Sequence, residues 1–192
     1  GNSGVSTLVS EFPEAAPGSE LQLLANQVQI TGGAVTVAGF ESTVVEAGSD
    51  AIDPAAVTDP ADAALVFKGD SRLNLDGAVV LSAPVIVAEQ AASADIQAMG
   101  PVNVLPGDAA ATLPASSGQA AKLRLLGSRI DYNGRIVLPS GTITLVQTGD
   151  VGAPVGGDNL ELQPGSIIDV SGESVAFGPK ILSTPGGAVD LV

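Results

Sequence analysis

The chain has 192 residues, of which 45% are hydrophobic but only 3% aromatic, and its net charge is −14 with seven Lys and Arg residues. This charge excludes nucleic-acid binding, whose affinity comes mostly from phosphate contacts, and it disfavours insertion into anionic membranes. The absence of Cys and His excludes disulfides, thiolate metal sites and His-dependent catalytic triads. Ala, Val, Leu and Ile supply the apolar content, which suits a narrow interior packed in thin layers and indicates an all-β protein.

The N-terminal part of the chain predicts short strands separated by turns of one or two residues. One candidate strand lies at 5–9, and clear alternation of apolar and polar residues begins at 21–25. The next predicted strands, each followed by a glycine, are 28–30, 35–37 and 43–45. Paired hairpin strands would carry turn-specific signals such as Asn-Gly between them. The spacing therefore favours a chain that winds around a common axis.

Three segments interrupt this rhythm and are predicted to be loops inserted into single coils. They lie at 49–62, 106–120 and 150–158, and they are rich in Ala, Pro, Ser or Gly. Alternation resumes between them. The strands predicted in these regions are 65–67, 73–75, 79–81, 85–87, 96–99, 102–105, 123–126, 130–132 and 136–138.

A glycine-led pattern recurs in the C-terminal part. It reads Gly-Thr-Ile-Thr-Leu at Gly141, Gly-Ser-Ile-Ile-Asp-Val at Gly165 and Gly-Ala-Val-Asp-Leu at Gly187, so the copies start 24 and 22 residues apart. Earlier copies begin at Gly33, Gly77, Gly100 and Gly127. A short strand that recurs at this period indicates stacked coils. We therefore predict a single parallel β-helix over residues 1–192, with about eight or nine coils at roughly 22 residues per coil.

Parallel stacking predicts which side chains form the interior. Alternate residues of each strand point inward, and we expect them to stack on their equivalents in neighbouring coils. The expected inward set includes Ile143 with Leu145, and either Ile167 or Ile168 with Val170. Stability then grows with the number of neighbouring coils, because one coil cannot bury its own face. Asn26, Asn103 and Asn133 are expected at turns, where they either stack or cap or, as the favoured alternative, are simply solvated.

Acidic residues in the first insertion are the strongest candidates for chemistry. Clustered carboxylates beside a basic residue are typical of sugar-cleaving enzymes, and carboxylate oxygens also bind calcium. The alternative is solvated charge in a Pro/Ala-rich loop. The candidates are Asp50, Asp53, Asp59 and Asp62, with Lys68, Asp70 and Arg72 nearby.

Two glycine-containing segments carry no site. The segment 152–157 lacks the Lys-Ser/Thr of a phosphate-binding loop, and 156–162 matches a calcium-binding glycine-aspartate repeat only once. We therefore assign no catalytic, cofactor-binding or metal-binding residue.

Several runs in the C-terminal half resemble the filamentous haemagglutinin-like exoproteins of Gram-negative bacteria. These runs are 121–131, Ile136–Leu145, Pro164–Gly172 and Thr184–Val189, and the rhythm of 21–48 and 73–83 is similar. The resemblance implies a right-handed β-helix, export through an outer-membrane secretion partner, and an adhesive or inter-bacterial role at the cell surface. It carries no catalytic residue.

The sequence thus predicts a non-enzymatic rod or shaft segment of a large secreted surface protein, cut from a longer chain and without a cofactor. The three insertions are the expected contact surfaces, since binding residues concentrate on loops. Unpaired strand edges at the ends of a coil stack invite pairing with another chain. A self-stacking subunit of an extracellular filament is therefore the alternative, with a polysaccharide-acting enzyme as a minor one.

Overall fold

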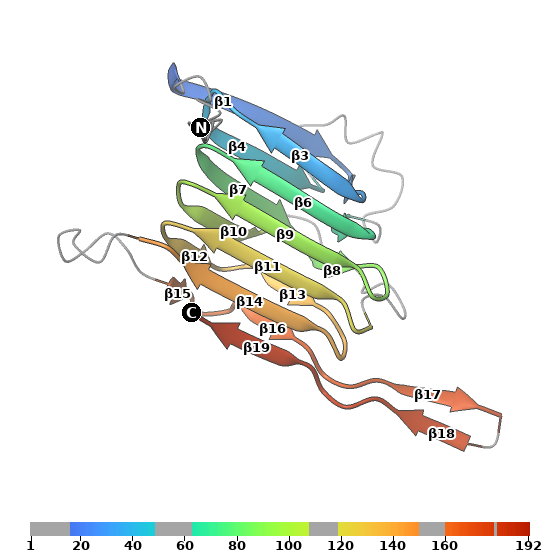
Figure 1. The fold of residues 1–192 in the computed structure, drawn as a ribbon. Helices are drawn as coiled ribbons and strands as arrows, with labels where there is room; N and C mark the ends of the chain where they lie inside the picture. Colours follow the sequence, from blue (N-terminus) through green and yellow to red (C-terminus); the bar gives the residue numbers. More distant parts are fainter. Residues whose placement is uncertain (1–15, 49–62, 108–118, 150–159, 179) are drawn as a thin grey trace, which may run out of the picture.

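The computed structural model describes residues 16–48, 63–107, 119–149, 160–178 and 180–192. These residues form an all-β arrangement in which three parallel sheets, here called A, B and C, run along a common axis (Figure 1). The described part of the chain contains no helix, and so none that could cross a membrane. The prediction of parallel strands in stacked sheets is confirmed.

The strands return to each sheet in regular order. Sheet A contains β1 (Ala16–Ala25), β4 (Phe40–Ala47), β7 (Ala78–Ala83), β10 (Val102–Pro106), β12 (Ile130–Tyr132) and β15 (Leu160–Leu162). Sheet B contains β2 (Gln27–Ile30), β5 (Ala64–Phe67), β8 (Ile86–Ala88), β13 (Arg135–Val137) and β16 (Ile167–Asp169). Sheet C contains β3 (Gly33–Val37), β6 (Asp70–Leu75), β9 (Ser93–Ala98), β11 (Lys122–Gly127), β14 (Thr142–Gln147) and β19 (Ala188–Leu191). The path A to B to C, repeated along the axis, is solenoid-like.

Within the described residues the longest sheets have six strands, so the eight or nine coils expected for the whole chain are not confirmed. The spacing between paired strands is not a constant 22 residues. Leu21 pairs with Thr43 at that spacing, but Thr43 pairs with Val79 and Ile130 with Leu160, which are 36 and 30 residues further along. In each of these pairs the two strands are direct neighbours, so the longer spacing adds no strand to sheet A.

Inward side chains form continuous columns, as the alternation predicts. In sheet C one column runs through Leu73, Ile96, Leu125 and Leu145, each of which is buried. Ile143 is also fully buried, so the predicted inward pair of β14 is confirmed. Of the two alternatives predicted at β16, the inward residue is Ile168. Ile168 and Val170, which follows the strand, pack against the core, whereas Ile167 is exposed. Burial of each such side chain contributes about 1.5–3 kcal/mol.

Sheet B is buried on both of its faces in the middle of the stack. Val87 and Val137 point away from the central core, yet they are only 1% and 7% exposed, and they form a second small apolar cluster with Ala64 and Val85. Continuous apolar runs such as Ile-Val-Ala in β8 are typical of strands covered on two sides. Between β10 and β11 the described residues contain no sheet B strand, and β13 pairs directly with β8.

Small residues allow the chain to turn the corners between sheets. A Cβ atom at Gly77 would overlap the carbonyl oxygens of Phe40 and Glu41 in the preceding coil, so close backbone stacking requires glycine there. At the corner that leads into sheet C, three non-glycine residues occupy the left-handed region. They are Ala91, Ala120 and Ser140, with φ of 57°, 56° and 54°.

A two-stranded antiparallel arm, β17 (Ser174–Phe177) with β18 (Lys180–Ser183), extends away from the stack between β16 and β19 (Figure 1). Side-chain hydrogen bonds connect the base of this arm to the preceding coils. Ser140 Oγ lies 2.7 Å from Thr184 Oγ1, and the Gln119 amide donates to the Glu173 carboxylate. The sequence pattern did not predict this hairpin.

The strand at 5–9 and most of the three predicted insertions lie outside the described residues. At the edge of the second insertion, Pro106 still belongs to β10. Asn103 is the second residue of that strand, so a turn role for it is wrong, because β10 continues past it in register with β7. Asn133 does follow a strand end, directly after β12.

Candidate binding face on sheet C

The outward face of sheet C carries a row of polar side chains along the axis. Since the strands are in parallel register, residues one coil apart lie side by side. One row joins Arg72 of β6 to Asp95 of β9 and then to Arg124 of β11. Thr144 and Asp190 continue the row on β14 and β19.

Asp95 is the centre of this row. Its carboxylate forms an ion pair with Arg72, whose Nε lies 3.3 Å away, and it accepts hydrogen bonds from Arg124 Nη1 at 3.4 Å and from the Gln97 side-chain amide at 2.7 Å. The two arginine side chains are 58% and 42% exposed, so each guanidinium keeps donors that face solvent. Such exposed pairs contribute about 0–1 kcal/mol each. Their main effect is to hold two guanidinium groups in place on one face.

Two hollows flank Asp95 on this face. The first, of about 280 Å³, is lined by Gly33, Ala34, Asp70, Ser71, Arg72, Ser93 and Asp95. The second, of about 260 Å³, shares Arg72, Ser93 and Asp95 with the first and extends to Lys122, Arg124, Thr142 and Thr144. Three of the seven Lys and Arg residues of the chain are therefore gathered here. Guanidinium groups bind carboxylate, sulfate or phosphate oxygens in bidentate fashion, so the face is suited to an anionic ligand.

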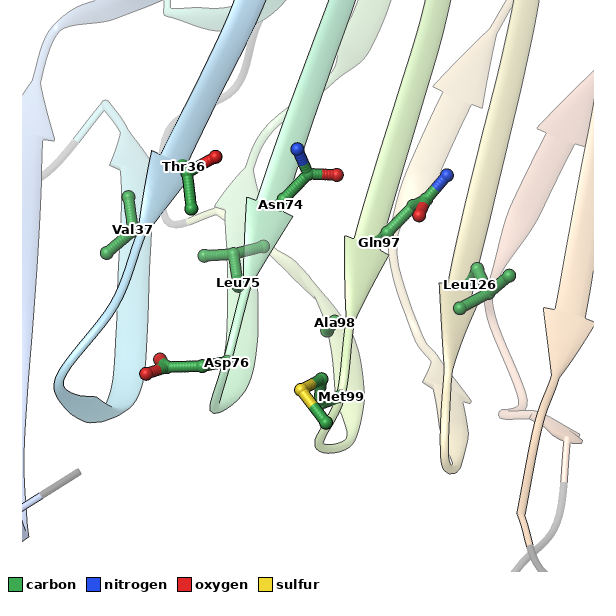
Figure 2. Close-up of a pocket in the computed structure, with 9 residues that line it drawn as sticks. All are labelled: Thr36, Val37, Asn74, Leu75, Asp76, Gln97, Ala98, Met99 and Leu126. Atoms are coloured by element: carbon green, nitrogen blue, oxygen red, sulfur yellow. The ribbon is translucent and has the colours of Figure 1, made fainter. Parts of the chain in front are cut away.

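A third hollow of about 170 Å³ lies where the sheet C strands end (Figure 2). Asn74 and Gln97 stand on its polar side, one coil apart. Leu126 and Met99, whose side chain is 74% exposed, give it an apolar side. Asp76 also lines this hollow, and one oxygen of its carboxylate accepts the Gly39 amide at 2.6 Å. This hollow offers amide hydrogen bonds beside an aliphatic surface.

The acidic cluster expected from the sequence is placed only in part. Asp50, Asp53, Asp59 and Asp62 lie outside the described residues, so neither the sugar-cleaving nor the calcium-binding hypothesis is tested there. Asp70 and Arg72 both line the first hollow, whereas Lys68 precedes β6 at a corner, where its amide donates to the Ile30 carbonyl. Within the described ranges no three acidic residues are grouped closely enough to hold a metal ion.

Sequence reasoning missed Asp95 and Arg124 because they are 23 and 52 residues from Arg72. The signal that identifies them is the strand register, which the sequence does not state directly. No protein-family model matches the chain, and neither a curated protein nor a solved structure matches it. Inferences about its function are therefore drawn from its own residues and geometry.

Proposed function

We propose that the chain is a non-enzymatic shaft segment of a large secreted surface protein of a Gram-negative bacterium, of the filamentous haemagglutinin-like kind. The observation that supports this proposal best is the continuity of the inward columns through six strands in sheets A and C. A stack of this type gains stability with each neighbouring coil and holds outward side chains at a regular spacing. In this proposal the stacked coils give the surface protein its length, and the outward side chains of the coils contact the ligand.

The proposal includes right-handed winding through six coils in the described residues. Connections between parallel strands of one sheet are right-handed in about 98% of cases, because the strand twist favours that path. The resemblance to the exoprotein family implies the same hand. Coil-by-coil stacking also fits export in extended form through an outer-membrane partner, since folding can propagate from one coil to the next. The chain has no Cys, so it needs no oxidation to fold.

We assign the contact role of the shaft to the outward face of sheet C. The chain as a whole is strongly acidic. This face, in contrast, carries the guanidinium groups of Arg72 and Arg124 in one row, and both groups pair with the Asp95 carboxylate. Carboxylated or sulfated surface glycans have the charge and the repeating form to lie along such a row.

Cell-surface location is tested by labelling intact cells of the bacterium that makes the protein with antibody raised against the purified chain. The proposal expects labelling before lysis and loss of the label after brief protease treatment of whole cells. Labelling that appears only after lysis would overturn it.

The contact role is tested by binding of the purified chain to immobilised acidic and neutral polysaccharides. The double variant Arg72→Ala/Arg124→Ala should lose at least tenfold in affinity for the acidic ones. Arg129→Ala is the control, because Arg129 also makes an ion pair, a partly buried one at 2.8 Å to Asp131, but does not lie on this face. Equal loss in the control would show that general charge, not the sheet C face, governs binding.

A further inference from the structure

The row of charged side chains and the third hollow lie on the same three strands of sheet C. Each of β6, β9 and β11 carries one residue of the row Arg72–Asp95–Arg124 and, two residues further along, one residue that lines the hollow. On β9 the hollow residue is Gln97, and on β11 it is Leu126. Two residues of a parallel strand span about 6.6 Å, so one ligand can reach both the cationic groups and the hollow.

The hollow combines side-chain amides with an aliphatic surface. Asn74 and Gln97 carry their amide groups on neighbouring strands, and Leu126 and Met99 supply the aliphatic part (Figure 2). The amide nitrogen of Gln97 donates to Asp95, and its carbonyl oxygen remains an acceptor. An acetamido group matches this lining, because its N–H and C=O pair with amides while its methyl group contacts aliphatic side chains.

The size of the hollow limits what it can hold. Its volume is about 170 Å³. Pockets that enclose a whole small-molecule ligand have volumes of roughly 300–1,000 Å³. The hollow therefore suits one substituent of a larger ligand, and the rest of that ligand lies on the open face beside it.

We infer that the sheet C face binds an acidic polysaccharide whose sugar units carry acetamido groups close to their carboxylates. The acetamido group enters the third hollow, and the carboxylate lies in the second hollow. That position is favoured because the second hollow contains Lys122 and Arg124, whereas the first contains the carboxylate of Asp70. Thr144 adds a hydroxyl group there. This inference rests on the contact role proposed above and names the class of glycan.

An acidic peptide also combines carboxylates with amides, but the sheet favours a glycan. The strands β6, β9 and β11 each have a neighbouring strand on both sides, so they offer no edge to which an extended peptide could add as a further strand. A peptide carries its amides within its main chain. A polysaccharide presents the acetamido group as a side substituent, which can enter a small hollow.

The test compares the affinity of the purified chain for three oligosaccharides of similar length by isothermal titration calorimetry. Those from hyaluronan carry carboxylates and acetamido groups, those from alginate carry only carboxylates, and those from chitin carry only acetamido groups. Hyaluronan should bind at least fivefold more tightly than alginate, and chitin more weakly than either. Equal affinities for hyaluronan and alginate would overturn the inference and leave the contact role standing. Absence of binding to both would overturn the contact role and the inference with it.

Variants locate the acetamido group. Met99→Ser removes part of the aliphatic surface and should lower the ratio of the hyaluronan affinity to the alginate affinity several-fold. Leu105→Ser is the matched control, because Leu105 is also an exposed apolar residue but belongs to β10 of sheet A, and the ratio should not change. A ratio that Met99→Ser leaves unchanged would overturn the placement in the hollow. Poly-L-glutamate that binds as tightly as hyaluronan would overturn the choice of a glycan.

Discussion

The hydroxyl group of Tyr132 donates a 2.7 Å hydrogen bond to the carbonyl oxygen of Ile167, which lies 35 residues further along the chain in the last strand of sheet B. Tyr132 is fully buried and is the only tyrosine of the protein. Its ring continues an apolar column of sheet A, while its hydroxyl fixes the backbone of another sheet. One side chain thus joins two sheets near the end of the stack.

Replacement of Tyr132 by Phe should lower the free energy of unfolding by about 1–2 kcal/mol. The ring would still fill its place, but the Ile167 carbonyl would lose its donor. Urea unfolding followed by circular dichroism measures this change as a lower midpoint at an unchanged slope. A variant as stable as the parent would show that the hydrogen bond contributes nothing in net terms.

Alkaline titration of the single tyrosine should be delayed until the protein unfolds. Burial raises the pKa of the Tyr132 hydroxyl well above its ordinary value, because the phenolate form loses hydration. The unfolded chain releases this proton near pH 10 and the folded chain does not, so the contribution to stability is fully present below about pH 10 and is lost as the pH rises further. Phenolate absorbance should therefore appear together with loss of the circular dichroism signal. Ionisation near pH 10 in the folded protein would contradict this expectation.

Replacement of Ser71 by Ala should stabilise the protein by about 1 kcal/mol. Ser71 occupies an inward column between Gly33 and Ala94, is 5% exposed, and has no hydrogen-bond partner for its hydroxyl in the described part of the chain. Removal of a buried, unpaired hydroxyl recovers its desolvation cost. Ser93→Ala, at an exposed position on the next strand, is the control and should change stability by less than about 0.5 kcal/mol. Thermal unfolding of both variants measures the difference.

Replacement of Gly77 by Ala should destabilise the protein by about 1–3 kcal/mol, because the added methyl group would force two carbonyl oxygens of the preceding coil to move. Gly186→Ala provides the comparison. A Cβ there would meet its nearest atom, the Val170 carbonyl oxygen, at 3.7 Å, which is an ordinary contact. Equal effects at the two positions would show that the coils separate easily at the Gly77 corner. Chemical denaturation of the two variants side by side is the measurement.

Replacement of Ala120 by Gly should stabilise the chain by up to about 1 kcal/mol, and replacement by Val should destabilise it. Ala120 is exposed and has a φ of 56°, a conformation that costs L-residues about 1–2 kcal/mol and glycine much less. The greater flexibility of glycine in the unfolded chain offsets about 0.5–1 kcal/mol of this gain. A melting temperature that falls for both variants would mean that the methyl group of Ala120 makes a stabilising contact.

Much of the coil pattern could be predicted from the sequence because inward residues repeat their chemistry on every layer. Ile143 and Leu145 alternate with Thr142 and Thr144, and this alternation identifies the strand and its inward face without any knowledge of the partner strands. The period alone does not fix the coil number, because it does not show how many residues leave the stack between two layers. The arm at 174–183 was missed since its short strands pair only with each other, and no periodic signal marks them.

The binding face was harder to predict, because it depends on which strands are neighbours. Asp70 and Arg72 were candidates on account of their closeness to an acidic segment, yet the group that holds Arg72 is Asp95, one coil away. A shift of the register by a single residue would place Asp95 inside the core. The charge content of the sequence alone therefore does not locate such a face. The apolar columns locate it, because they fix the register of the strands.

The direct pairing of β13 with β8 has a mechanical consequence. From β8 to β13 sheet B advances by one strand spacing, about 4.8 Å, while sheets A and C advance by two over the same coils. A body whose one side is shorter than the others has to lean toward that side. A shaft that repeats this feature along its length would be an arc or a superhelix instead of a straight needle.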